Sequence, residues 1–330
     1  MGSLSSLQNK QILITGAAGF IGSHLCDAFL ANDAKVLAVD NFLTGDPRNI
    51  EHLVDKNPNF SFIKADVTQP AETYLPQNFV PDVVLHFASP ASPPLYQAHP
   101  VETYAVNSFG THYLLQYLLK NAPKARFLFA STSEIYGDPA QHPQKESYWG
   151  NVNPNGIRSC YDEGKRLGET ICGVHFRDLK LDVRIVRIFN TYGPRMDIND
   201  GRVIPDFMKK SLANEPLVIF GDGQQTRSYC YVSDLVEGIV RFVTADELAG
   251  ETINLGNPDE YTILETAKAV QQLTGDAQTV FKPLPQDDPT RRRPDISKAQ
   301  KLLDWSPKVG FQEGLEKTYA YFQQHAQKAS

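Results

Sequence analysis

The chain of 330 residues is poor in cysteine and contains no long apolar run. Its four cysteines are widely spaced and include no C-x-x-C pair, which argues against a zinc knot and against a disulfide framework. No run of about 18 apolar residues is available to span a bilayer, and the N-terminus lacks the charged and then apolar layout of a signal peptide. We therefore expect a cytoplasmic protein that does not associate with membranes.

A surplus of positive charge is also lacking. The formal net charge is -6 and the isoelectric point is about 5.8. A general nucleic-acid surface needs an excess of Lys and Arg, so nucleic acid is not an expected partner. The sequence predicts no metal site either. Its 41% hydrophobic content is enough for a sizeable core, and its length favours about two domains.

Short apolar runs alternate along the chain with segments of helical periodicity. The runs are QILIT (11–15), KVLAVD (35–40), FSFIKAD (60–66), DVVLHF (82–87), RFLFAS (126–131) and DVRIVRI (182–188). Unbroken apolar runs of this length are typical of buried parallel strands joined by crossover helices. Residues 101–120 and 160–178 carry apolar residues at helical spacing. The pattern predicts an α/β fold with a Rossmann-type, doubly wound parallel sheet.

The composition of the sequence changes after Gly193, because prolines there are scattered among short predicted elements. This change favours a smaller, less regular C-terminal domain for the substrate. We predict a Rossmann domain over residues 1–190, with part of 220–260 returning to it. Residues 191–330 are expected to form mainly the second domain.

A glycine-rich turn follows the first predicted strand. The string ITGAAGFIGSHL places Gly16, Gly19 and Gly22 between that strand and a predicted helix. Glycines permit the tight turn and let backbone amides approach a pyrophosphate at the positive end of the helix. Asp40 ends the second strand, where a carboxylate can accept from both ribose hydroxyls and would repel a 2′-phosphate. The pattern favours NAD over NADP, although a tight turn in any α/β protein can also use three glycines.

Tyr161 and Lys165 lie four residues apart on a predicted helix and therefore share a face. A nearby ammonium stabilises a phenolate, and bringing a tyrosine to neutrality takes roughly 4 kcal/mol of differential stabilisation. Tyr161 is thus a candidate general base for a sugar hydroxyl. Without the glycine turn upstream, the same spacing would describe an ordinary amphipathic surface pair.

The glycine spacing and the Y-x-x-x-K pair resemble the extended short-chain dehydrogenase/reductase family. Longer strings resemble the UDP-glucuronic acid decarboxylases of that family over nearly the whole chain. These include HFASPASPPLYQAHP, STSEIYGDPAQHPQKESYWGNVNPNGIRSCYDEGKR, RIFNTYGPRM, GDGQQTRSYCYVSDLVEG and DDPTRRRPDISKAQKLLDW. The resemblance implies NAD as cofactor and adds Asp66 and Val67 near the adenine. The expected cofactor contacts are Gly16, Gly19, Phe20, Ile21, Gly22, Asp40, Asn41, Asp66, Val67, Tyr161 and Lys165.

The resemblance also implies a reaction. Tyr161 takes the proton of the sugar 4-hydroxyl of UDP-glucuronate while hydride passes to NAD, which leaves a β-keto acid. Carbon dioxide departs, Tyr161 and Thr132 stabilise the enolate, and returned hydride gives UDP-xylose. Ser133 stands where related dehydratases carry an aspartate, which this reaction does not require. Glu134 is expected to position the ring or a water, or to deliver a proton to the enolate carbon.

Further residues are expected at the substrate. Arg227 resembles the pyrophosphate arginine of the family, and Arg292 resembles an arginine that reaches back into the active site, although a run of three arginines is otherwise a solvated surface. Ser133, Asn190, Arg202 and Tyr96 are additional contact candidates. By resemblance, a homodimer would form through 101–120 and 160–178.

Two other classes of function stay open from the sequence, namely another nucleotide-sugar enzyme and a noncatalytic protein. A nucleotide-sugar 4-epimerase would have no need of Glu134 beside Thr132, and a 4,6-dehydratase would want an aspartate at position 133. A noncatalytic NAD-binding scaffold should have lost some of Thr132, Tyr161 and Lys165, and all three are present.

Overall fold

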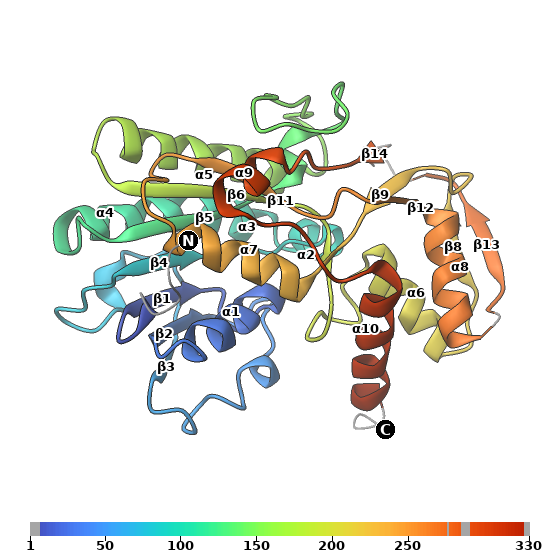
Figure 1. Cartoon of the computed structure of the whole chain (residues 1–330), viewed down its shortest axis with the longest axis horizontal. Coiled ribbons are helices and arrows are strands. Elements are labelled where there is room, and N and C mark those ends of the chain that lie inside the picture. The colour runs from blue at the N-terminus through green and yellow to red at the C-terminus, as the bar shows by residue number, and fades with distance from the viewer. Residues whose placement is uncertain (1–6, 276, 285–290, 327–330) are drawn as a thin grey trace.

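A seven-stranded parallel sheet forms the centre of the computed structural model, which describes residues 7–275, 277–284 and 291–326. The strand order is β11-β6-β5-β4-β1-β2-β3 (Figure 1). Its strands are β1 (Gln11–Thr15), β2 (Lys35–Asp40), β3 (Phe60–Lys64), β4 (Val83–His86), β5 (Arg126–Thr132), β6 (Asp182–Ile188) and β11 (Thr252–Leu255). Six of these strands are the six predicted runs, so the predicted Rossmann-type fold is confirmed.

Both faces of the sheet are covered by helices (Figure 1). Ile12 and Ile14 of β1 belong to one buried cluster with side chains of α1 and α7, whereas Leu13 belongs to a second cluster with side chains of α4 and α5. Successive residues of a strand point to opposite faces, which explains why the strands read as unbroken apolar runs. The flanking helices are α1 (Phe20–Leu30), α3 (Pro100–Ala105), α4 (Thr111–Asn121), α5 (Ser159–Arg177) and α7 (Val232–Thr244).

The segment predicted as one helix over 101–120 is interrupted by a wider, π-helical turn at Val106–Gly110, between α3 and α4. The Asn107 side chain donates to the carbonyl oxygen of Thr103 at 2.8 Å, and the Thr111 hydroxyl donates to the carbonyl oxygen of Asn107 at 2.8 Å. These side-chain bonds add to the backbone bonds around the widened turn, where the amide of Val106 also donates to the carbonyl oxygen of Thr103. The second predicted helix is α5.

The seventh strand, β11, pairs with β6 at the edge of the sheet and was not identified from the sequence. The predicted division into two domains stays a prediction. The remaining elements are α2 (Pro93–Ala98), β7 (Thr191–Tyr192), α6 (Val203–Leu212), β8 (Leu217–Phe220), β9 (Thr226–Ser228), β10 (Cys230–Tyr231), β12 (Glu260–Thr262), α8 (Ile263–Thr274), β13 (Thr279–Lys282), β14 (Arg291–Arg292), α9 (Ser297–Leu303) and α10 (Phe311–Ala326).

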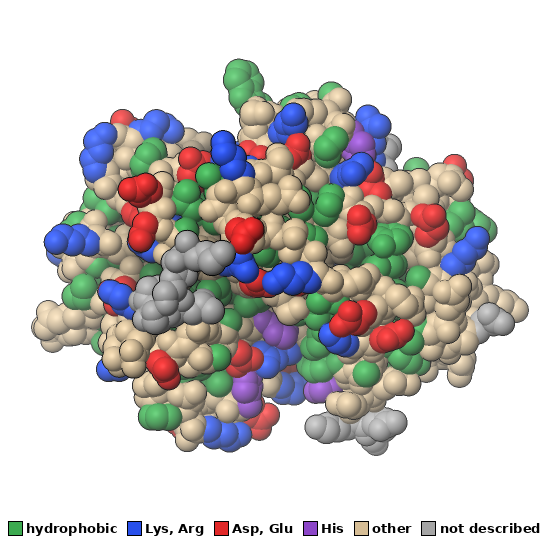
Figure 2. All heavy atoms as spheres, in the orientation of Figure 1, with side chains coloured by type: hydrophobic (Ala, Val, Ile, Leu, Met, Phe, Trp, Pro, Cys, Tyr) green, Lys and Arg blue, Asp and Glu red, His purple; other side chains and the backbone are tan. Residues whose placement is uncertain are grey.

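Acidic and basic side chains are interspersed over the face shown in Figure 2. Within the described ranges, no helix combines the length and the apolar character that crossing a membrane requires. All four cysteines are free, and three of them are buried.

Candidate active site

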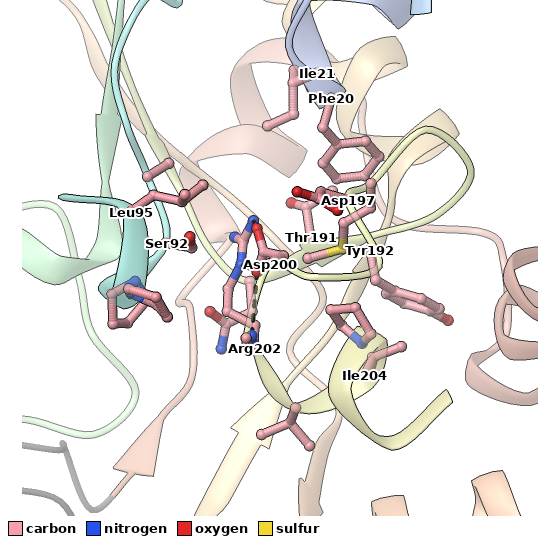
Figure 3. A pocket seen from close by; sticks show the side chains of 18 of the residues that line it. Phe20, Ile21, Ser92, Leu95, Thr191, Tyr192, Asp197, Asp200, Arg202 and Ile204 are labelled. Atoms are coloured by element: carbon pink, nitrogen blue, oxygen red, sulfur yellow. Dashed lines mark hydrogen bonds and ion pairs between the residues drawn. The ribbon is translucent and has the colours of Figure 1, made fainter. Parts of the chain in front are cut away.

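A cavity of about 950 Å³ lies at the carboxyl ends of the central strands. Its walls come from the turn after β1, the ends of β4, β5 and β6, and the elements α5, α6 and α10. The chain order reverses between β1 and β4, and ligands of doubly wound sheets bind at such a switch point. The cavity is therefore the candidate site, and Figure 3 shows part of its lining.

The glycine turn forms one end of the cavity. Gly16 has φ +70°, and a Cβ there would lie 2.6 Å from the backbone nitrogen of Ala88. A Cβ on Gly22 would lie 2.1 Å from the carbonyl oxygen of Gly16. Helix α1 begins at Phe20, directly after Gly19, so its first amides face the cavity that these residues and Ile21 line. This close-packed turn at a helix N-terminus fits the pyrophosphate of a dinucleotide.

We expect Gly22→Ala to abolish measurable NAD retention and to lower the free energy of unfolding by about 1–3 kcal/mol, because the added methyl overlaps the turn. Urea unfolding and the NAD released on denaturation measure the two effects. Gly310→Ala is the matched control, since a Cβ at Gly310 meets nothing within 4 Å. Normal NAD content in Gly22→Ala protein would contradict the role of the turn.

Asp40 lies at the end of β2 but does not line the cavity. Its carboxylate oxygens accept from the backbone amides of Ala18 at 2.9 Å and Phe42 at 2.8 Å. Burial raises the pKa of this carboxyl, and the backbone hydrogen bonds oppose the rise. A carboxylate has about four lone-pair positions, so these two bonds leave capacity for a ribose.

The other expected adenosine contacts also lie outside the cavity lining. Asn41 and Asp66 are exposed, and each accepts from the backbone amide two residues further along the chain. Val67 is buried beside Gly110. Their contacts with a cofactor stay predictions.

Thr132, Ser133 and Glu134 come together at the cavity because β5 ends at Thr132 and a short 3₁₀ helix, Ser133–Tyr136, follows it. The Thr132 hydroxyl accepts from the backbone amide of Glu134 at 3.2 Å. It also forms a side-chain hydrogen bond with Tyr161. The strand end thus aims the hydroxyl at the candidate base.

Tyr161 and Lys165 both line the cavity from the first turns of α5. Burial raises the pKa of the Tyr161 phenol, and the bond to Thr132 opposes the rise. The Lys165 ammonium donates to the carbonyl oxygen of Ala130 at 2.7 Å, and its burial lowers its pKa to about 7. The side chains alone therefore leave Tyr161 protonated at neutral pH, so the phenol needs a further positive charge beside it to act as a base. Tyr96 stacks on Tyr161, with ring centroids 5.0 Å apart and planes at 2°.

Glu134 is held by two arginines. Arg158 Nη2 donates to Glu134 Oε2 at 2.5 Å, and Arg292 Nη2 donates to the same oxygen at 3.2 Å. Burial alone would raise the pKa of the carboxyl, but Arg292 and then Arg158 lower that pKa to about 2. Glu134 is therefore ionised at neutral pH. Arg158 was not predicted from the sequence. Its position three residues before Tyr161, at the start of the helix, could have indicated that it lies at the site.

Strand pairing brings Arg292 to the cavity. The short strand β14 pairs in parallel with β9, and this register sets Arg292 opposite Arg227. Arg292 is only 1% exposed, and its Nη1 donates to the carbonyl oxygen of Ser133. The arginine run could have been a solvated surface segment. Arg291 is indeed exposed, whereas Arg292 is buried.

Arg202 and Asn190 also line the cavity. Arg202 forms a two-pronged ion pair with Asp200, at 2.5 and 2.8 Å, and projects into the space shown in Figure 3. Several other residues that were not predicted from the sequence also line the cavity: Ser92, Leu95, Thr191, Asp197, Asp200, Tyr321, Phe322 and His325. Among the residues that the structure describes, no group of three or more His, Cys, Asp or Glu side chains could hold a metal ion.

The family model of the NAD dependent epimerase/dehydratase family matches residues 12–256. With the fold and the cavity described above, this match places the chain in that family.

Within the family, the chain is similar to UDP-glucuronic acid decarboxylases. It is 50% identical over 306 residues to UDP-glucuronic acid decarboxylase 4 of Arabidopsis thaliana, covering 92% of this chain and 67% of that protein. It is 48% identical over 320 residues to UDP-glucuronic acid decarboxylase 1 of Danio rerio, covering 97% and 74%. The structure of UDP-glucuronic acid 4-epimerase from Bacillus cereus in complex with UDP-glucuronic acid and NAD is similar with a TM-score of 0.86. It is 32% identical and covers 96% of this chain and 99% of that chain.

Proposed function

We propose that the protein is an NAD-dependent UDP-glucuronate decarboxylase that forms UDP-xylose. One observation carries this proposal beyond family membership: a single cavity holds the Thr132–Tyr161–Lys165 set together with an ionised Glu134 between two arginines. The glycine turn at the other end of the cavity fits the cofactor. Bound NAD would accept hydride from the sugar 4-position, return it after decarboxylation, and place a positive charge near the phenol.

Tyr161 is the proposed base and acid of the cycle. Its oxygen takes the proton of the sugar 4-hydroxyl and returns a proton to the same oxygen when the ketone is reduced. Thr132 holds the phenol by its side-chain hydrogen bond. Oxidation at the 4-position leaves a ketone next to the carbon that bears the carboxylate, and this ketone receives the electrons that carbon dioxide leaves behind. Hydrogen bonds from Tyr161 and Thr132 stabilise the resulting enolate.

The proposed role of Glu134 is to position the ring and a water, and this water supplies the proton that the enolate carbon takes up after carbon dioxide leaves. A carboxyl whose pKa is about 2 carries no proton at neutral pH, so the alternative of proton delivery by Glu134 itself is the weaker one. Ser133 presents a small neutral side chain at this wall. An aspartate there would place a second negative charge beside the carboxylate of the substrate.

The diphosphate of the substrate is proposed to contact Arg227. Its buried guanidinium lines the cavity from β9 and offers the planar donor pair that suits phosphate oxygens. Asn190, Arg202 and Tyr96 are proposed as further substrate contacts because they line the same cavity as Arg227.

Proton NMR of the purified protein with UDP-glucuronate and NAD tests the function. A UDP-xylose signal with carbon dioxide release and no net NADH is the expected result. A UDP-galacturonate signal would instead identify a 4-epimerase, and a keto pentose with NADH would show that hydride return fails. Unchanged substrate would favour a noncatalytic scaffold.

The protein is further proposed to be a homodimer. Large apolar side chains are exposed on α3, α5 and the π-helical turn: Val101 at 57%, Tyr104 at 45%, Phe109 at 54% and Leu167 at 47%. These four side chains lie on adjacent helices, and an exposed apolar surface of this kind is suited to pack against the same surface of a second copy of the chain.

We expect light scattering to give twice the chain mass of 36.8 kDa. Leu167→Glu should give monomers, because it places a charge within the apolar contact. Val280→Glu, on the exposed strand β13, is the control and should leave the mass unchanged. A monomeric parent protein would contradict the dimer.

A further inference from the structure

Asp162 is a buried carboxyl group beside the proposed active site, and the proposed chemistry leaves it without a role. It follows Tyr161 on α5, is 6% exposed and does not line the cavity. Its Oδ2 lies 4.0 Å from Nε of Arg158. Arg158 in turn binds Glu134, which also binds Arg292. The four side chains form a row of alternating charge that begins at buried Asp162, passes through the partly buried Arg158 and Glu134, and ends at buried Arg292.

The second carboxyl oxygen has no partner. Asp162 Oδ1 is buried and makes no hydrogen bond within the described part of the chain. An ionised carboxylate with an unsatisfied oxygen is far more costly to bury than a neutral carboxyl group. The surroundings of Asp162 therefore favour its protonated form more than those of an ordinary aspartate.

The groups facing Asp162 act in both directions. Burial and the charge of Glu134 raise the pKa of the Asp162 carboxyl to about 7, against the opposing charges of Arg158 and Arg292. Glu163 on the same helix adds a smaller effect in the raising direction. Tyr96 and Tyr161 are neutral neighbours, because burial raises the pKa of each phenol. Arg227 faces the far end of the row from β9.

We propose that Asp162 is a positioning residue that takes up a proton when UDP-glucuronate binds and gives it up when the sugar loses its carboxylate. This inference rests on the proposed function. Protonation of Asp162 makes this row and its surroundings one charge unit more positive than they are when Asp162 is ionised. The cavity lined by Arg158 and Arg292 then receives the sugar carboxylate with one negative charge fewer beside it.

A bound anion beside the row raises the pKa of Asp162 further, so binding consumes a proton at a pH above 7, and affinity falls as the pH rises. UDP-xylose carries no carboxylate and leaves the pKa of Asp162 where it is in the free protein. Asp162 thereby favours the charged substrate over the uncharged product, and the preference weakens at alkaline pH.

Calorimetric titration of the NAD-loaded protein at pH 7.5 tests the proposal, with turnover blocked by Tyr161→Phe. Comparing buffers of different ionisation enthalpy gives the protons bound per ligand. UDP-glucuronate should take up about half to one proton per site and UDP-xylose close to none. Adding Asp162→Asn should remove the uptake. Adding Glu163→Gln, which neutralises the neighbouring and half-exposed carboxylate, should leave most of the uptake in place, because Glu163 affects the pKa of Asp162 less than Glu134 and the two arginines do.

Steady-state kinetics give an independent readout in protein with Tyr161 intact. The KM for UDP-glucuronate should rise by about tenfold per pH unit above pH 7.5, and Asp162→Asn should flatten that rise. A purely structural role would change stability without moving this profile. Binding of UDP-glucuronate without proton uptake, or uptake that persists in Asp162→Asn, overturns this inference alone. Failure of UDP-glucuronate to bind at all overturns the proposed function as well.

Discussion

Replacing Tyr161 with phenylalanine is expected to lower kcat by about 10²- to 10⁴-fold, the usual contribution of a positioned acid and base. The phenylalanine ring keeps the stack on Tyr96 and removes only the oxygen that bonds with Thr132. Binding of UDP-glucuronate should therefore persist while both hydride steps slow. Initial rates of carbon dioxide release, together with calorimetric affinity, separate the two effects.

The matched control for this substitution is Tyr113→Phe. Tyr113 lies on α4, is half-buried and does not line the cavity. Its variant should retain the parent rate. If Tyr161→Phe kept more than about a tenth of the parent kcat, the assignment of the base would have to be abandoned.

Replacing Arg292 with methionine is expected to lower kcat/KM by about 10²- to 10³-fold, because a fixed positive charge is removed from the reacting end of the cavity. The same change should cost about 1–3 kcal/mol in the free energy of unfolding, since the buried carbonyl oxygen of Ser133 loses its donor. Initial rates and urea unfolding measure the two losses.

Arg292→Met should also change the pH dependence. The pKa of Glu134, now about 2, should rise toward its ordinary value because Arg292 is its strongest favourable charge. The stability contributed by ionised Glu134 is present at high pH and is lost as the pH falls through the folded pKa. The acid limb of both activity and stability should therefore move toward neutral pH.

Arg291→Met is the control for Arg292→Met. The two arginines are adjacent, but Arg291 is exposed. Its variant should differ from the parent by less than about 0.5 kcal/mol and keep the parent kcat/KM. Equal effects at the two positions would show that general charge, and not the placement of Arg292, matters.

The sequence predicts features that depend on near neighbours in the chain. The spacing of Gly16, Gly19 and Gly22 after an apolar run predicts the strand, turn and helix that the structure contains. The four-residue spacing of Tyr161 and Lys165 on one helix brings both side chains to one cavity. In these cases the regular backbone of a helix or a strand determines which side chains lie on the same face, so the spacing in the sequence is enough to predict it.

Spacing along the chain does not predict every feature, even within a single helix or strand. The apolar periodicity of 101–120 indicates a helix but not its π-helical turn, because that turn depends on hydrogen bonds from Asn107, one of which reaches Ser89. The position of Asp40 after β2 was predicted, but the backbone amides of Ala18 and Phe42 that bind its carboxylate were not.

By itself, then, the sequence determined the parallel sheet, the glycine turn and the Tyr161–Lys165 pair. Only the tertiary structure decided that β14 pairs with β9, which sets Arg292 beside Arg227 and against Glu134. Only the tertiary structure showed that Asp162 is a buried carboxyl group with an unpaired oxygen. The physical reason is range: strand and helix periods act over a few residues, whereas burial and ion pairing depend on which distant segments pack together.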